Sequence, residues 1–168
     1  MNLLKNHIKT LVNHDFVLRS QPKDCKHIPV LRKVTLSAQF PSKNKEEIVA
    51  LFELLTFHKP IVTRSHKNIL SLALRKGNLV GIKLVLKKKP IYDFLMFFLF
   101  IILPQSKSFK GFKQSDKTFH WQIKDINSLN EVIPIYIYIA NLSHVDIAID
   151  GFNLNSNFFE ACRFPPKN

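Results

Sequence analysis

Alternating apolar and polar positions mark the strands that this chain is expected to form. Between Leu31 and Phe40 the residues alternate, with Val34, Leu36, Ala38 and Phe40 on one face, which is typical of a strand with one buried face. The polar face of this strand consists of Lys33, Thr35, Ser37 and Gln39. Further strands are expected at Ile69 to Arg75, Leu79 to Lys87, Phe119 to Lys124, Ile135 to Ile139 and Val145 to Ile149, and Ile61 begins a short edge segment.

A short turn joins two of these expected strands. Lys76, Gly77 and Asn78 separate the run that ends at Arg75 from the run that begins at Leu79, and a glycine-containing turn of this length is typical of a β-hairpin. The second strand alternates, with lysines on one face only. The hairpin is therefore expected to project basic side chains outward.

Apolar residues three or four positions apart predict the helices. Met1 to Arg19 has the pattern of an amphipathic helix, and Asn44 is a suitable N-cap for a helix that ends near Thr56. Asn155 could cap a short final helix through Arg163. The buried face of the second helix is expected to consist of Ile48, Leu51, Phe52 and Leu55.

The phenylalanine-rich run from Phe94 to Leu103 is expected to lie in a buried helix. Pro90 suits its first turn, and the helix is expected to stop at Pro104. The run is too short for membrane insertion, because a spanning helix needs about 20 apolar residues. The Ser- and Lys-rich stretch from Gln105 to Lys117 is expected to form a surface loop. The aromatic residues assigned to the core are Phe94, Phe97, Phe98 and Trp121.

Mixed helices, strands and hairpins predict an α+β fold, with a mainly antiparallel sheet and helices packed on one face. The chain has 168 residues, which is an ordinary length for one domain. We therefore expect a single domain covering 1–168.

The charge of the chain indicates a polyanionic partner. Lys and Arg total 25 against 12 Asp and Glu, which gives a formal net charge of +13. The hydrophobic fraction of 46% distinguishes the chain from a disordered basic tail. Abundant Phe, Ile, Asn and Lys, whose codons are rich in adenine and thymine, suggest an organellar genome, while a nuclear genome of similar base composition stays open.

Candidate chemistry is sparse. Cys25 and Cys162 stand far apart and in no metal-binding spacing, and the seven His residues show no metal pair at helical spacing. No set of Ser, His and acid is recognisable. The sequence therefore predicts neither an enzyme nor a bound metal or cofactor.

Three colinear blocks resemble the ribosomal L-five family, the large-subunit proteins that carry 5S rRNA. His58 to Ser65 is similar to the family's Gln-Lys-Pro segment with its following Thr and basic residue. Leu74 to Leu86 is similar to its Arg-x-Gly turn and Gly-x-Lys strand, and the third block combines Tyr92 to Leu95, Leu103 with Pro104, and Phe109 to Gly111. The family's Gly-Arg-Gly segment is replaced here by Gln114 to Lys117. Because the chain diverges from the bacterial forms of this family at its glycines, a mitochondrial origin is favoured over a plastid one.

The resemblance implies a structural protein of the large subunit that binds 5S rRNA, where this RNA is present, and large-subunit rRNA in the central protuberance. It also implies contacts with peptidyl-site tRNA, neighbouring ribosomal proteins and the small-subunit head protein of the S-thirteen family. The implied rRNA-binding residues are Lys33, Thr35, Ser37, Gln39, Lys59, Arg64, His66 and Lys67. The implied tRNA-contact loop contains Ser71, Arg75, Lys76, Gly77 and Asn78, and the implied intersubunit bridge contains Lys107, Phe109, Lys110 and Phe112.

Two other functions stay open at this point. Basic α+β domains of this size also serve as free RNA-binding or RNA-processing factors in organelles. The phenylalanine-rich segment could instead lie in a membrane interface as an amphipathic helix. For each single polar residue named above, a merely solvated surface is the competing interpretation.

Overall fold

The computed structural model describes residues 3–21, 28–39, 45–105, 111–115, 118–123, 145–152, 154, 156–162 and 164. It contains a six-stranded sheet in the order β2-β3-β1-β6-β5-β4, and its β2–β3 and β4–β5 pairs are antiparallel. The strands are β1 (Val30–Gln39), β2 (Ile61–Arg64), β3 (Leu79–Lys87), β4 (Lys113–Ser115), β5 (Thr118–Ile123) and β6 (Val145–Phe152). The predicted α+β class is confirmed.

The helices lie close to where the apolar spacing placed them. The N-terminal helix is continuous, through α1 (Leu3–His7), a π-helical turn (Ile8–Val12) and α2 (Asn13–Ser20). The others are α3 (Lys45–Thr56), α4 (Lys89–Phe97) with a π-helical turn (Phe98–Ile102) and α5 (Leu103–Gln105), and α7 (Ser156–Ala161). None of the helices in the described part of the chain combines the length and apolar character that a membrane crossing needs.

The described residues belong to two compact units. Unit 1 comprises 1–34, 86–121 and 148–168, and unit 2 comprises 35–85 and 122–147. The boundary between the units falls within four of the strands, β1, β3, β5 and β6. The expectation of a single domain covering 1–168 stays a prediction.

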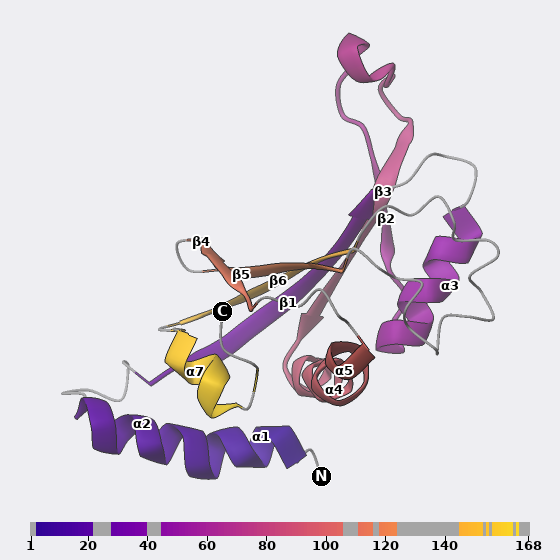
Figure 1. Cartoon of the computed structure of the whole chain (residues 1–168). Helices are drawn as coiled ribbons and strands as arrows, with labels where there is room; N and C mark the ends of the chain where they lie inside the picture. Colours follow the sequence, from indigo (N-terminus) through magenta and orange to yellow (C-terminus); the bar gives the residue numbers. More distant parts are fainter. Residues whose placement is uncertain are drawn as a thin grey trace. The chain divides into compact units, whose positions relative to one another are not determined.

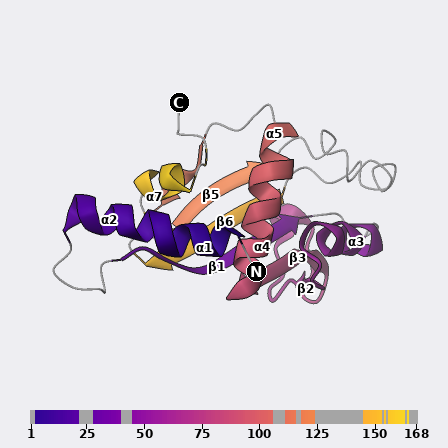
Figure 2. The same cartoon turned by 90° about the horizontal axis from the view of Figure 1, so that it is seen from below.

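In unit 1 the helices cover one face of the strands. Figures 1 and 2 show α1, α2, α4 and α7 on the same side of β1, β5 and β6. The burial of alternate residues agrees with this arrangement, because Phe119 and Trp121 of β5 are buried whereas His120 is exposed. The N-terminal helix contributes Leu4, Ile8 and Val12 to the core, one residue per turn as its amphipathic pattern requires.

Aromatic rings fill the core of unit 1. The ring of Phe98 is fully buried and lies 5.1 Å from the ring of Trp121 and 6.1 Å from that of Phe164, measured between centroids. Phe94 is buried as predicted, while Phe97 is only half-buried because Phe94 and Phe98 occupy the inward face of the helix. The helix ends at Gln105, one residue past Pro104.

The expected surface loop from Gln105 to Lys117 is wrong in part. Phe112 is buried against Phe98, Phe159 and Phe164, and residues 113–115 pair with β5. The Ser and Lys content of the segment predicted a solvated loop. Phe112 is buried because the rings of Phe98, Phe159 and Phe164 surround it in the folded chain.

Unit 2 packs α3 on the sheet through the predicted apolar face, since Ile48, Leu51, Phe52 and Leu55 are all buried. The expected cap at Asn44 lies outside the described residues, as do the expected strand at Ile135 to Ile139 and the expected cap of the last helix at Asn155. In β3 the side chains of Ile82 and Leu84 are buried, whereas those of Lys83 and Val85 are exposed.

The hairpin differs from the prediction in one respect. The partner of β3 is β2, with Ile61 opposite Lys83 and Thr63 opposite Gly81, and the expected strand from Ile69 to Arg75 is wrong. That segment contains a 3-10 turn (Leu70–Leu72) and a single bridge between Ile69 and Leu74. Ala73 there adopts the left-handed conformation, with φ of 51°, which a strand does not permit. In Figure 1 this segment projects beyond the ends of β2 and β3.

The close approach of β1 and β3 is expected to require a residue without a side chain at position 81. A Cβ atom at this position would collide with the carbonyl group of Ala38. Gly81→Ala should therefore lower the free energy of unfolding by about 1–3 kcal/mol, measured by denaturant titration. Val85→Ala, on an exposed position of the same strand, is the control and should change it by about 0.5 kcal/mol or less. Equal stability of both variants would contradict the close approach.

Candidate nucleic-acid interface

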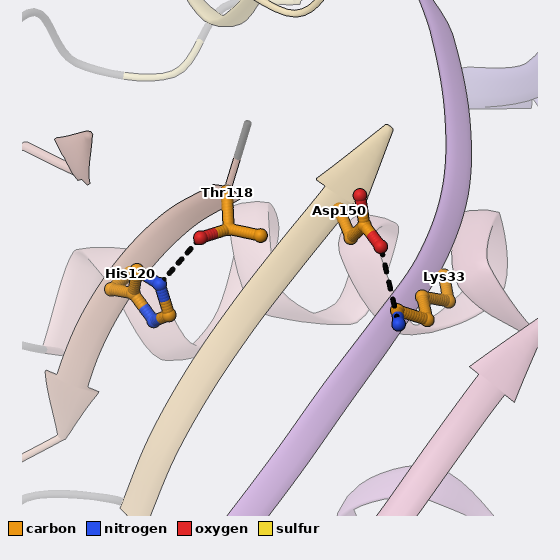
Figure 3. Close-up of polar contacts among 4 residues, drawn as sticks. All are labelled: Lys33, Thr118, His120 and Asp150. Carbon is orange, nitrogen blue, oxygen red and sulfur yellow. Dashed lines mark hydrogen bonds and ion pairs between the residues drawn. The ribbon is translucent and has the colours of Figure 1, made fainter. Parts of the chain in front are cut away.

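The face of unit 1 that the helices leave uncovered carries polar and charged side chains, and Figure 3 shows four of them. The Nζ atom of Lys33 lies 3.2 Å from Oδ2 of Asp150, and Oγ1 of Thr118 lies 2.6 Å from Nε2 of His120. The Lys33 side chain is 43% exposed, so it remains accessible to solvent while paired with the carboxylate. The predicted rRNA-contact residue Lys33 is therefore partly neutralised by an acid of this chain.

The other predicted contact residues of β1 belong to unit 2. Thr35 and Ser37 are half-buried and Gln39 is exposed, and these three alternate with the buried Leu36 and Ala38. The predicted polar face of this strand is confirmed as a face. The side chains of Thr35 and Ser37 are short, which allows another backbone to come close to the strand.

The end of the hairpin in unit 2 is held by hydrogen bonds between its two sides. The backbone N–H of Ser65 donates to the carbonyl of Asn78 at 2.9 Å, and that of Gly77 donates to the carbonyl of Ser65 at 2.8 Å. The backbone N–H of Lys76 donates to Oδ1 of Asn68 at 2.7 Å. Gly77 has φ of 91°, a conformation that favours glycine. These bonds give the hairpin tip, residues 65–78, a defined shape.

The hairpin tip and the strand end next to it bring together two groups of residues that the sequence analysis treated separately. Arg64, His66 and Lys67 precede the 3-10 turn, and Arg75 and Lys76 follow it, and all five side chains are exposed. Ser71 and Asn78 of the implied tRNA loop are exposed as well. Lys59 is exposed just before β2, at the other end of that strand. The result is a concentration of positive charge on a projecting element, suited to phosphate contact.

The implied intersubunit bridge is only partly described. Lys107, Phe109 and Lys110 lie outside the described residues. Phe112 is 8% exposed, so its side chain supports the core of unit 1 and is not available for a surface contact.

Sequence reasoning missed four residues of these surfaces: Asn68, Leu70, Arg32 and Phe152. Oδ1 of Asn68 accepts a hydrogen bond from the backbone amide of Lys76, eight positions along the chain. The local sequence pattern does not predict such a bond. Leu70 is 96% exposed although it stands in an apolar run that resembled a strand. Arg32 lies over the ring of Phe152, a pair that exists only because β1 and β6 are neighbours in the sheet.

Cys162 is a buried, unpaired cysteine of unit 1. Burial raises the pKa of the Cys162 thiol to about 12, and a protonated, buried thiol is a poor nucleophile. The part of the chain that the structure describes contains no group of three or more His, Cys, Asp or Glu side chains placed to hold a metal ion.

A polar sheet face and a cationic hairpin are typical of an α+β protein that binds a polyanion. Comparison of the sequence with known proteins specifies which proteins of this class it is similar to. No protein-family profile matches the chain. It is 29% identical over 162 residues to the large ribosomal subunit protein uL5m of Reclinomonas americana, covering 88% of this chain and 89% of that protein. It is 32% identical over 115 residues to the uL5 protein of Pediococcus pentosaceus, covering 66% of this chain and 64% of that protein.

A third relative is the uL5 protein of Buchnera aphidicola, which is 27% identical over 124 residues and covers 71% of this chain and 68% of that protein. The two bacterial relatives are both named uL5. The relative that is similar over 88% of this chain is named uL5m, the organellar form. These relatives confirm the predicted resemblance to the uL5 family of large ribosomal subunit proteins, and the similarity to the organellar uL5m protein covers 88% of this chain.

Asn68 is expected to hold the hairpin tip in shape. Asn68→Ala removes the acceptor for the Lys76 amide, and a hydrogen bond of this kind contributes about 0.5–1.5 kcal/mol. Hydrogen exchange at Lys76 should therefore accelerate by about 2- to 10-fold, measured by mass spectrometry, while the thermal midpoint of the whole protein stays the same. Asn68→Asp, which keeps an acceptor oxygen, is the matched control. Unchanged exchange in Asn68→Ala would show that the tip does not depend on this bond.

Proposed function

We propose that this protein is a structural constituent of the large subunit of a mitochondrial ribosome, where it binds 5S rRNA and large-subunit rRNA in the central protuberance. The observation that carries the proposal is the similarity to uL5m of Reclinomonas americana over 88% of the chain. The net charge of +13 supports an RNA partner, because Lys and Arg neutralise phosphates and release counterions. The role is structural, and no chemical step is assigned to it.

The sheet face is proposed as the rRNA-binding surface. On β1 the hydroxyl groups of Thr35 and Ser37 can bond to 2′-hydroxyls, and Gln39 adds a donor and an acceptor. Lys33 contributes charge while paired with Asp150. Contacts of this kind position RNA by its backbone and carry little base preference.

The hairpin tip is proposed to contact tRNA in the peptidyl site. The exposed cations at and beside the tip are Arg64, Lys67, Arg75 and Lys76, and the exposed side chain of His66 lies between the first two in the sequence. The hydrogen bonds across the tip reduce the entropy lost on binding, since the loop already has its shape. The backbone amides of Lys76 and Gly77 already donate hydrogen bonds within the tip, so phosphate contact is proposed for the exposed cationic side chains.

A bridge to the small-subunit head protein of the S-thirteen family is proposed for Lys107, Phe109 and Lys110. Phe112 has a different part in this proposal. Its burial against Phe98 and Phe159 anchors the C-terminal end of the segment that carries those three residues.

The ribosomal role is tested by quantitative mass spectrometry of washed organellar large subunits, combined with RNA crosslinking. We expect one copy per subunit, with rRNA crosslinks to the peptide 30–40 and tRNA crosslinks to the peptide 71–80. Substoichiometric recovery that falls further on salt washing would contradict the proposal and favour a free RNA-binding factor. Release of the protein with membranes, and not with subunits, would favour the interfacial-helix alternative.

The tRNA contact is tested in ribosomes that carry Arg75→Ala with Lys76→Ala. Each lost phosphate contact should lower the slope of log affinity against log salt concentration by about 0.7–0.9. We therefore expect weaker binding of peptidyl-site tRNA at low salt and a smaller difference from the wild type at high salt. The control is Lys9→Ala, an exposed cation of the N-terminal helix. If the double variant and the control bind tRNA equally well, in subunits of normal composition, the hairpin tip does not contact peptidyl-site tRNA through these two side chains.

A further inference from the structure

Phe152 is an exposed aromatic residue on the uncovered face of unit 1. It is the last residue of β6, and 57% of its surface is accessible. Residues 145, 147, 149 and 151 of that strand are buried, so the alternation of a strand places Phe152 on the opposite face, together with Asp150. The ring therefore gives a polar surface one flat apolar area, which a second flat ring could cover.

Arg32 of β1 supports the ring of Phe152 from within the same unit. The guanidinium carbon of Arg32 lies 5.4 Å from the ring centroid, within the range of a cation–π interaction. More than half of the Phe152 side chain stays accessible with the guanidinium in this place. Because the N–H donors of a guanidinium lie in its plane, a guanidinium that contacts a ring through its face can still bind an anion at its edge.

Two charged residues and one exposed apolar residue, Val30, lie near this pair in the two strands. Lys33 follows Arg32 on β1 and is paired with Asp150, two residues before Phe152. This ion pair occupies the carboxylate of Asp150. The ring of Phe152 and the side chain of Val30 form a small apolar area for a protein partner. An RNA nucleotide offers both a flat base and a phosphate and fits the pair on both counts.

We propose that Arg32 and Phe152 form a stacking platform for an unpaired RNA base, with the edge of the Arg32 guanidinium binding the adjoining phosphate. The inference rests on the proposed rRNA binding and adds a defined contact to it. Stacking on an aromatic ring is tolerant of base identity, because every base has a flat face. The platform therefore selects unpaired nucleotides over a paired stem and sets no base sequence.

The test uses the full-length protein and two fluorescent probes of equal charge, a single-stranded RNA of twelve adenines and a twelve-unit abasic ribose-phosphate strand. Affinities are measured across a series of salt concentrations. Phe152→Ala should weaken binding to the adenine strand by about 5- to 100-fold. It should leave the affinity for the abasic strand and the salt slope of both unchanged, since no charge is lost.

Three further variants separate stacking from other causes. Arg32→Ala should weaken binding to both probes and lower the salt slope by about 0.7. Phe152→Trp, which keeps an aromatic face at this position, should retain the preference for the adenine strand over the abasic strand. The matched control is Phe57→Ala, at a phenylalanine that is 83% exposed and lies in unit 2, which should bind both probes like the wild type.

The outcomes distinguish the platform from the function on which it rests. If the wild-type protein binds the adenine strand and Phe152→Ala binds it equally well, the platform is overturned while rRNA binding stands. A loss of affinity for the abasic strand in Phe152→Ala would also overturn it, because the change would then be one of folding or charge. If the wild-type protein binds neither probe, the proposed rRNA binding fails together with the platform.

Discussion

The burial of a single face of the sheet is the constraint on which the other features depend. In unit 1 the rings of Phe94, Phe112, Trp121 and Phe164 surround the buried ring of Phe98 and exclude water from one side of the strands. The alternation of a strand then directs the intervening side chains of β1, β5 and β6 to the other side. Lys33, Asp150 and Phe152 are brought onto one surface in this way, and the polar surface is a direct consequence of the aromatic core.

The second feature is a hairpin that extends past the strands it comes from. The register of β2 and β3 places Arg64 opposite Leu79, and beyond that pair the tip is shaped by Asn68, Ser65 and Gly77 rather than by a third strand. A projecting loop of this kind loses little stability when it carries cations, since its side chains keep their hydration. It suits a partner that approaches from outside the molecule, such as a nucleic acid backbone.

Much of the fold could be predicted because period and polarity are local. The alternating residues of β1 and β5 and the apolar face of α3 lie where the pattern placed them. The failures share one cause. The run from Ile69 to Arg75 has strand-forming residues, yet a strand needs a neighbour, and the partner of β3 is the four-residue β2. Phe112 follows a polar stretch, yet it is drawn into the core by rings that are distant in the sequence.

The sequence by itself determined the α+β class, the polyanionic nature of the partner and the family resemblance, because these rest on composition, periodicity and short colinear motifs. Only the tertiary structure decided which charged residues are paired and which act together. Lys33 with Asp150, Arg32 with Phe152, and Asn68 with Lys76 are contacts between separate segments. Their existence depends on strand order and loop geometry, which are set by the packing of the whole chain and leave no local signature in the sequence.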